Sequence, residues 1–123
     1  MSKGRRDADY LDDMKHGIKK ILAHLEGLTR DEFTQDEWLQ DATVRNIEII
    51  GEAAKQLSEQ TRALHPEVQW TQLIGMRDRL AHGYFAINLD VVWNTVQEDL
   101  PHLLSHLEAL QQKLAGTSAA PKQ

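Results

Sequence analysis

The apolar residues of the chain recur at intervals of three and four over most of its length, which is the period of an amphipathic α-helix. One such stretch predicts a first helix from about Asp7 to Leu28, and a second predicts a long helix from Asp36 to about Ser58. Between them, Gly27 and a short acidic segment predict a turn. No segment alternates convincingly with the period of two that a half-exposed strand requires, so the pattern favours an all-α fold.

The middle of the chain predicts two more helical segments separated by a bend. A short helical turn is expected at residues 59–64, and Pro66 then disfavours helical dihedrals at the residue before it. Thr71 is a suitable N-cap for the next helix. That helix should end near His82, because Gly83 follows and glycine is common just beyond a helix end.

A last amphipathic helix is expected near the carboxyl end, capped by Asn88 or Asp90 and carrying apolar residues from position 92 to position 114. Pro101 should kink or break this helix. Short connections between these segments predict an antiparallel bundle of four to five helices.

The composition limits the classes of protein that the chain can represent. Its 123 residues, 41% of them hydrophobic, suit one domain spanning residues 1–123, with ends at 1–6 and 116–123 that we expect to be flexible. Cysteine is absent, which excludes disulfides and thiolate zinc sites. The amino end lacks the apolar core of a signal peptide, and no segment is long and apolar enough to span a membrane, so we expect a cytoplasmic protein. A net charge of -5 argues against broad, sequence-independent binding to nucleic acid.

A local exception to this acidity is the segment from Arg77 to Tyr84, which combines arginine, histidine and a phenol. The guanidinium groups of Arg77 and Arg79 suit phosphate, and His82 can exchange a proton near neutral pH. Asp78 lies four residues before His82, on the same helical face, where its carboxylate could orient the imidazole. These groups suit metal-independent RNA cleavage by the 2′-hydroxyl, with no cofactor.

The spacing of Arg77 and His82 raises a geometric problem. Five positions of a straight helix give a net rotation of roughly 140°, so the two side chains do not share a face. The helix could unwind at Gly83, or a second copy of the chain could bring its own motif across a twofold axis, which we favour. The plainer alternative is that Arg77 and Arg79 pair with Glu48 or Glu52 on the preceding long helix while His82 caps a carbonyl.

Other polar patterns are better explained by ordinary helix surfaces. Glu98, His102 and His106 recur at intervals of four, as do the residues of a line on the first helix, and we expect both lines to be solvated faces rather than metal sites. The tryptophans could stack on bases, but packing in the core or at an interface is favoured for all three. The members of the first-helix line are Asp12, His16, Lys20 and His24, and the tryptophans are Trp38, Trp70 and Trp93.

Three separated blocks of the sequence, in this order, resemble the HepT-like branch of the HEPN superfamily. They are Arg45-Asn46-Ile47-Glu48-Ile49-Ile50-Gly51-Glu52-Ala53-Ala54, then Trp70-Thr71-Gln72-Leu73-Ile74-Gly75, and last Arg77-x4-His82-x-Tyr84. The resemblance extends from about Asp9 to Leu114. One departure is Asp78, where many relatives carry asparagine, and an acid there could weaken RNA binding.

The resemblance implies an all-α homodimeric toxin of a toxin–antitoxin pair, acting as a metal-independent ribonuclease with its cleft at the dimer interface. Arg77 and His82 correspond to the catalytic pair of the family, with Asp78 and Arg79 beside them. The antitoxin of the family is a minimal, MntA-like nucleotidyltransferase that transfers AMP to the motif tyrosine, here Tyr84. Two other readings stay open, namely a non-catalytic helical module that partners a nucleotidyltransferase, and a module that binds nucleotide without cleaving RNA.

Overall fold

The computed structural model of the chain describes residues 6–82 and 88–119. Within these ranges, the side chains of residues 77–82 and 117–119 are not described. The described residues form helices and connecting turns, with no strand among them, and the prediction of an all-α fold is confirmed. The elements in chain order are α1 (Asp7–Leu25), α2 (Arg30–Thr34), α3 (Glu37–Gln56), α4 (Glu59–Ala63), α5 (Trp70–His82), α6 (Leu89–Asn94), the π-helix η1 (Thr95–Asp99) and α7 (Leu100–Ala119).

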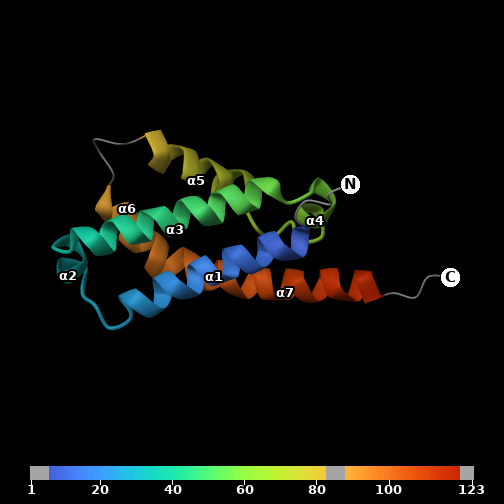
Figure 1. The fold of residues 1–123 in the computed structure, drawn as a ribbon, viewed down its shortest axis with the longest axis horizontal. Coiled ribbons are helices and arrows are strands. Elements are labelled where there is room, and N and C mark those ends of the chain that lie inside the picture. The colour runs from blue at the N-terminus through green and yellow to red at the C-terminus, as the bar shows by residue number, and fades with distance from the viewer. Residues whose placement is uncertain (1–5, 83–87, 120–123) are drawn as a thin grey trace.

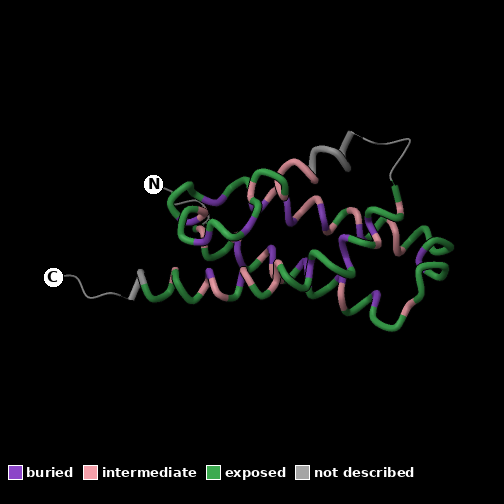
Figure 2. The backbone as a smooth tube through the Cα atoms, turned by 180° about the vertical axis from the view of Figure 1, so that it is seen from behind, coloured by how far each residue is buried: buried purple, intermediate pink, exposed green. Residues whose placement is uncertain are grey.

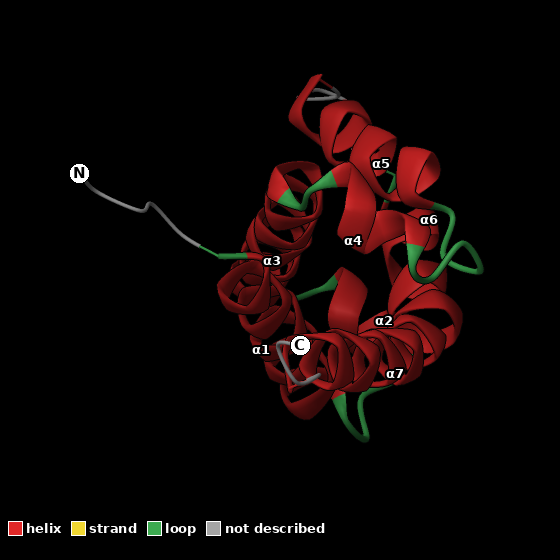
Figure 3. Ribbon diagram, turned by 90° about the vertical axis from the view of Figure 1, so that its right-hand side faces the viewer, coloured by secondary structure: helices red, strands yellow, loops and turns green. Residues whose placement is uncertain are grey.

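The longer helices α1, α3, α5 and α7 lie side by side and alternate in direction (Figure 1). Helix α5 packs on α3, α3 packs on α1, and α1 packs on α7. Viewed nearly along the helices, α5 lies at one end of this arrangement and α7 at the other, with α6 on the side that faces both (Figure 3). Within the described residues the chain is therefore an antiparallel helical bundle, while the expected homodimer stays a prediction.

The core lies between the long helices. Buried positions recur along α1, α3 and α7, whereas the described side chains of α5 are half-buried or exposed (Figure 2). Helices α1 and α3 approach closely at Gly17, where an added Cβ would lie 3.2 Å from Cγ1 of Ile50. The largest side chains that are almost completely buried include Phe33, Leu11, Met14, Ile18, Ile50, Leu107 and Leu110.

A polar contact near the amino end fixes α4 against α1. The carboxylate of Asp7 accepts hydrogen bonds from the backbone N–H of Ser58 at 3.1 Å, from the Ser58 hydroxyl at 2.6 Å and from the hydroxyl of Thr61. Burial raises the pKa of the Asp7 carboxylate, but the hydrogen bonds from Ser58 and Thr61 outweigh burial and hold it below its usual value. Since Ser58 is also the N-cap of α4, these contacts determine where the segment leading to α5 begins.

The first helix and the turn after it differ from the prediction. Helix α1 ends at Leu25, before the expected Leu28, because Gly27 adopts a φ of 79°, a left-handed conformation that interrupts the helix. The segment expected to be only an acidic turn contains α2. The signal for α2 was present in the sequence, because Thr29 and Glu32 form a capping box in which each side chain accepts from the other residue's backbone N–H.

Of the two predicted helix starts in the second half of the chain, one is wrong and one is confirmed. Helix α5 begins at Trp70, so the assignment of Thr71 as its N-cap was wrong. The prediction of Asn88 as a cap is confirmed, because its side chain accepts hydrogen bonds from the backbone N–H groups of Asp90 and Val91.

The expected effect of Pro101 takes the form of a π-helical turn instead of a break. Pro101 has no N–H to donate to the carbonyl four residues earlier. The chain widens into η1 just before it, and the backbone N–H of Leu100 bonds the carbonyl of Thr95, five residues back. Helix α7 then continues through Gly116 to Ala119, while the expected flexibility of residues 116–123 stays a prediction.

Candidate ribonuclease site

Helix α5 carries most of the motif that the sequence singled out. Arg77, Asp78, Arg79 and His82 belong to the carboxyl-terminal half of α5, which remains α-helical up to His82. Their side chains lie outside the described part of the structure, and so does Tyr84. The proposed ion pairs of Arg77 and Arg79, and any contact of His82, therefore stay predictions.

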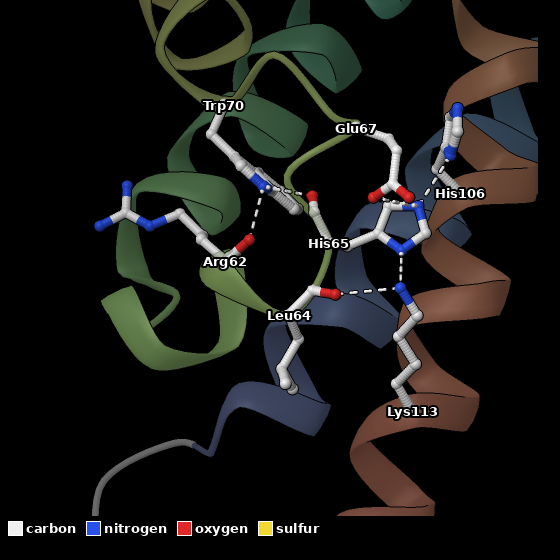
Figure 4. Close-up of polar contacts among 7 residues, drawn as sticks. All are labelled: Arg62, Leu64, His65, Glu67, Trp70, His106 and Lys113. Carbon is white, nitrogen blue, oxygen red and sulfur yellow. Dashed lines mark hydrogen bonds and ion pairs between the residues drawn. The ribbon is translucent and has the colours of Figure 1, made fainter.

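The position of α5 is fixed at its amino end by a tryptophan. The indole Nε1 of Trp70 donates to the backbone carbonyls of Arg62 and His65, both at 3.1 Å (Figure 4). Farther along α5, the half-buried side chains of Leu73 and Met76 pack against the core. Because Met76 immediately precedes Arg77, the same packing fixes the part of α5 that lies directly before the motif.

An open groove of about 630 Å³ lies beside this part of α5. One side belongs to α5 and the turn before it, and the other belongs to α6, η1 and the start of α7. Apolar side chains of α3, α5 and α7 contribute much of the lining, and polar groups surround them. The polar lining residues are Glu67, Gln69, Gln72, Thr95, Asp99, His102 and His106.

A buried histidine connects the turn before α5 with α7 at one end of the groove. His65 is only 5% exposed. Its Nε2 lies 2.8 Å from Nδ1 of His106 and 3.7 Å from Oε1 of Glu67 (Figure 4). On the other side of the ring, Nδ1 of His65 lies 2.9 Å from Nζ of Lys113, which also donates to the carbonyl of Leu64.

These contacts determine which ring nitrogens carry protons. A lysine ammonium can only donate, so Nδ1 of His65 must be the acceptor and must be unprotonated. The proton of the neutral His65 ring then lies on Nε2, which donates to Nδ1 of His106. Burial lowers the pKa of His65, and Lys113 and His106 lower it further while Glu67 opposes them, so the neutral form is favoured.

The described lining of the groove has an acidic electrostatic character. Glu67 and Asp99 contribute carboxylates, and no lysine or arginine is among the lining residues that the structure describes. A hydrogen bond from its own backbone N–H holds the pKa of Glu67 below its usual value. The groove therefore suits neutral or hydrogen-bond-donating groups better than phosphate, whereas the arginines of the motif begin directly after Met76.

No cluster of three or more potential metal-ligating side chains occurs among the residues that the structure describes. Within the same ranges, every helix is too short or too polar to cross a membrane. The expectation that the reaction needs no metal stays a prediction, because it concerns chemistry at side chains outside the described part.

Comparison with known proteins decides the family. The sequence model described as "Ribonuclease HepT-like" matches residues 14–110, from α1 to α7. This chain belongs to the ribonuclease HepT-like family. The matched region includes the three blocks on which the resemblance was based, and it includes the whole segment from Arg77 to Tyr84.

Relatives of this HepT-like chain match most of its length. It is 38% identical over 107 residues to the protein named "Probable ribonuclease HepT" of Thermococcus cleftensis, a match that covers 87% of this chain and 97% of the relative. It is 35% identical over 104 residues to a protein named as a candidate RNase in Caldanaerobacter subterraneus subsp. tengcongensis, covering 85% and 93%. A candidate RNase of Methanocaldococcus jannaschii is 34% identical over 107 residues, covering 87% and 88%. No solved structure gave a significant match.

The sequence interpretation missed the contacts of two histidines in this HepT-like chain. His106 was assigned to a solvated face, but it is half-buried and bonds His65, while Glu98 and His102 of the same line are exposed as expected. A possible signal for His65 was its position directly before Pro66, which places it in the bend between α4 and α5.

The line of polar residues on α1 and two of the three tryptophans lie where the sequence analysis expected them. The line on α1 is exposed at all four positions, as expected of a solvated face. Trp70 and Trp93 pack against the core. Trp38 is 88% exposed at the start of α3, so it does not pack in the core, and its packing at an interface stays a prediction.

Proposed function

We propose that this HepT-like protein is the toxin of a toxin–antitoxin pair and acts as a metal-independent endoribonuclease. The match to the ribonuclease HepT-like family over residues 14–110 is the observation that carries this proposal. Its substrate is RNA, because the reaction uses the 2′-hydroxyl as nucleophile. That oxygen attacks the adjacent phosphorus, the bond to the 5′-oxygen breaks, and a 2′,3′-cyclic phosphate and a 5′-hydroxyl are formed.

Arg77 and His82 are the proposed catalytic residues. His82 transfers a proton to or from the reacting oxygens, and Arg77 stabilises the negative charge that accumulates on the phosphorane. Asp78 orients the imidazole, and Arg79 adds positive charge for the backbone of the RNA.

The helical course of α5 supports a composite site made by two protomers. Because the backbone of α5 remains helical through His82, positions 77 and 82 of one chain are related by a rotation of roughly 140° about the helix axis. A twofold axis near this part of α5 would bring Arg77 of one protomer to His82 of its partner. The proposal therefore includes a homodimer with its cleft at the interface.

Control by a partner completes the proposal. A minimal nucleotidyltransferase antitoxin would transfer AMP from ATP to the Tyr84 phenol, whose oxygen attacks the α-phosphorus while pyrophosphate leaves. The attached nucleotide would occupy the cleft beside Arg77 and His82 and block RNA. Co-expression with such an enzyme should add the mass of one or more AMP units, and Tyr84→Phe should abolish the addition.

Cleavage of a labelled RNA in the presence of excess chelator tests the enzyme assignment. Arg77→Ala and His82→Ala should each lower the rate by about 100-fold or more. Arg45→Ala and His24→Ala are matched controls, because both residues are exposed and lie on other helices. Loss of wild-type cleavage on adding chelator would contradict the metal-independent mechanism, and full activity of His82→Ala would contradict the assignment of the catalytic residue. Absence of cleavage by the wild type would favour a non-catalytic binding module.

Mixing the two inactive variants tests the composite site. A heterodimer of Arg77→Ala and His82→Ala retains one site with both groups and one site with neither. With random exchange of protomers, half of the dimers are mixed, so about a quarter of the wild-type activity should return. A mixture that stays inactive although exchange is demonstrated would place both residues of each site on one protomer.

A further inference from the structure

We propose that the groove beside α5 binds a nucleobase of the RNA, and that it prefers bases with an exocyclic amine. This inference rests on the proposed ribonuclease function for the identity of its ligand. The described lining of the groove extends along α5 from Glu67, before the helix, to Met76, directly before Arg77, so a base in the groove would belong to a nucleotide on the same side of the molecule as the motif.

The size and lining of the groove suit a flat, polar-edged ring. Its volume of about 630 Å³ is within the range of about 300–1,000 Å³ that is usual for small-molecule sites. Of the apolar lining residues, the half-buried Leu73 and Leu103 can contact the faces of a base, while Ile47, Ile50 and Leu100 are buried, and the polar groups around them can meet its edges.

The hydrogen-bonding groups of the groove include a donor in a fixed position. Because Nδ1 of His106 accepts from His65, the proton of a neutral His106 ring lies on Nε2. Figure 4 shows this nitrogen at the end of the ring that points away from His65. Lys113 sets the tautomers of both histidines, because its ammonium donates to Nδ1 of His65, and Nε2 of His65 then donates to Nδ1 of His106.

Acceptors in the groove come from two exposed carboxylates, Glu67 and Asp99. An amine on a base edge donates to carboxylates, as cytosine N4 does in nucleic-acid complexes, while a neighbouring ring nitrogen accepts. Cytosine, adenine and guanine carry such an amine. Uracil has a carbonyl oxygen at the position of the cytosine amine, so it offers the carboxylates only its N3–H and should bind more weakly. The same carboxylates repel phosphate, which leaves the RNA backbone to the arginines of the motif.

Cytidine and uridine provide the sharpest test, because their bases differ only at position 4 and at N3. Cytosine has an amine donor at position 4 and an accepting N3, whereas uracil has a carbonyl oxygen and an N3–H donor. In nuclear magnetic resonance titrations of the full-length protein, cytidine should shift the ring signals of His102 and His106 and leave those of His24 unchanged. Uridine should bind about tenfold more weakly. The double variant Glu67→Gln, Asp99→Asn should fold normally, since both residues are exposed, and should bind the two nucleosides about equally. Absence of cytidine shifts at His102 and His106, or an unchanged preference in the double variant, would overturn the proposal.

The role of the oriented imidazole has its own test. Lys113→Met removes the donor that sets the tautomer of His65, and cytidine affinity should fall by about threefold to tenfold. Lys15→Met is the matched control, because Lys15 also contacts α7, through Gln111, but does not contact either histidine. Equal affinities in the two variants would remove His106 from the proposed recognition.

Cleavage of single-site oligoribonucleotides separates this inference from the proposed function. The wild type should cut faster beside cytosine than beside uracil, and the double variant should lose this difference while still cutting. Cleavage without any base preference would refute the groove and leave the ribonuclease intact. If cytidine binds in the groove but the protein cleaves no RNA, the ribonuclease proposal is refuted and the base-binding groove remains.

Discussion

Acidification should destabilise the protein through His65. This imidazole is buried, accepts a hydrogen bond from Lys113 and donates to His106, so it is neutral in the folded state. Protonation at Nδ1 would remove that hydrogen bond and place two positive charges at a distance of 2.9 Å. The unfolded chain has no such penalty and binds the proton at the ordinary pKa of about 6.5.

The sign and the size of the effect follow from proton linkage. The pKa of His65 is lower in the folded state than in the unfolded state, so its contribution to stability is complete above the unfolded pKa and is lost as the pH falls toward the folded one. One proton changes the free energy of unfolding by at most about 1.4 kcal/mol for each pH unit. The groups that face His65 are Lys113 and His106 from α7 and Glu67 from its own turn, and Glu67 alone opposes the loss.

Urea unfolding followed by tryptophan fluorescence, at several pH values between about 7.5 and about 5, measures this dependence. The wild type should lose more stability over this range than His65→Gln, which cannot bind the proton. His24→Gln is the control, because His24 is exposed and bonds only the carbonyl of Lys20 among the contacts described for it. Parallel curves for the wild type and His65→Gln would refute the assignment of a neutral, buried His65.

Two further substitutions test how the bundle is held together. Asp7→Ala removes the acceptor of three hydrogen bonds that join α1 to Ser58 and Thr61. It should lower the free energy of unfolding by about 2 kcal/mol in urea titrations at neutral pH. The loss should become smaller in acid, as the pH falls through the lowered folded-state pKa of the wild-type carboxylate. Gly17→Ala should lower the free energy of unfolding by about 1 kcal/mol. The reason is that the new Cβ would lie 3.2 Å from Cγ1 of Ile50, and this crowding costs more than the better helix propensity of alanine contributes. A gain in stability would mean that Ile50 moves aside easily.

The sequence predicted the long helices well because their periodicity is a property of burial. The apolar positions of α1 and α3 that set the pattern, such as Leu11, Ile18 and Ile50, are indeed buried. The errors occur where local chemistry decides. A capping box creates α2, and the tryptophan at the start of α5 joins the helix one residue before the expected cap at Thr71.

The candidate site was predictable only as far as a linear motif extends. The segment from Arg77 to Tyr84 is contiguous, so its composition could be recognised directly. The contact between His65 and His106 joins residues 41 positions apart, and nothing in the local pattern of either residue indicates the other. Tautomer, burial and groove lining all depend on that packing, so they become visible only once the helices are placed.

The π-helical turn at residues 95–99 joins α6 to α7 without a loop and lets the two helices pack against different neighbours. A step of five residues instead of four changes the angular phase of every side chain that follows. Helix α6 can thus direct its apolar side toward α2, while α7 directs its own toward α1, without a connecting loop. The change in side-chain direction occurs in η1, just before Pro101, and Thr95 and Asp99 of this segment line the groove.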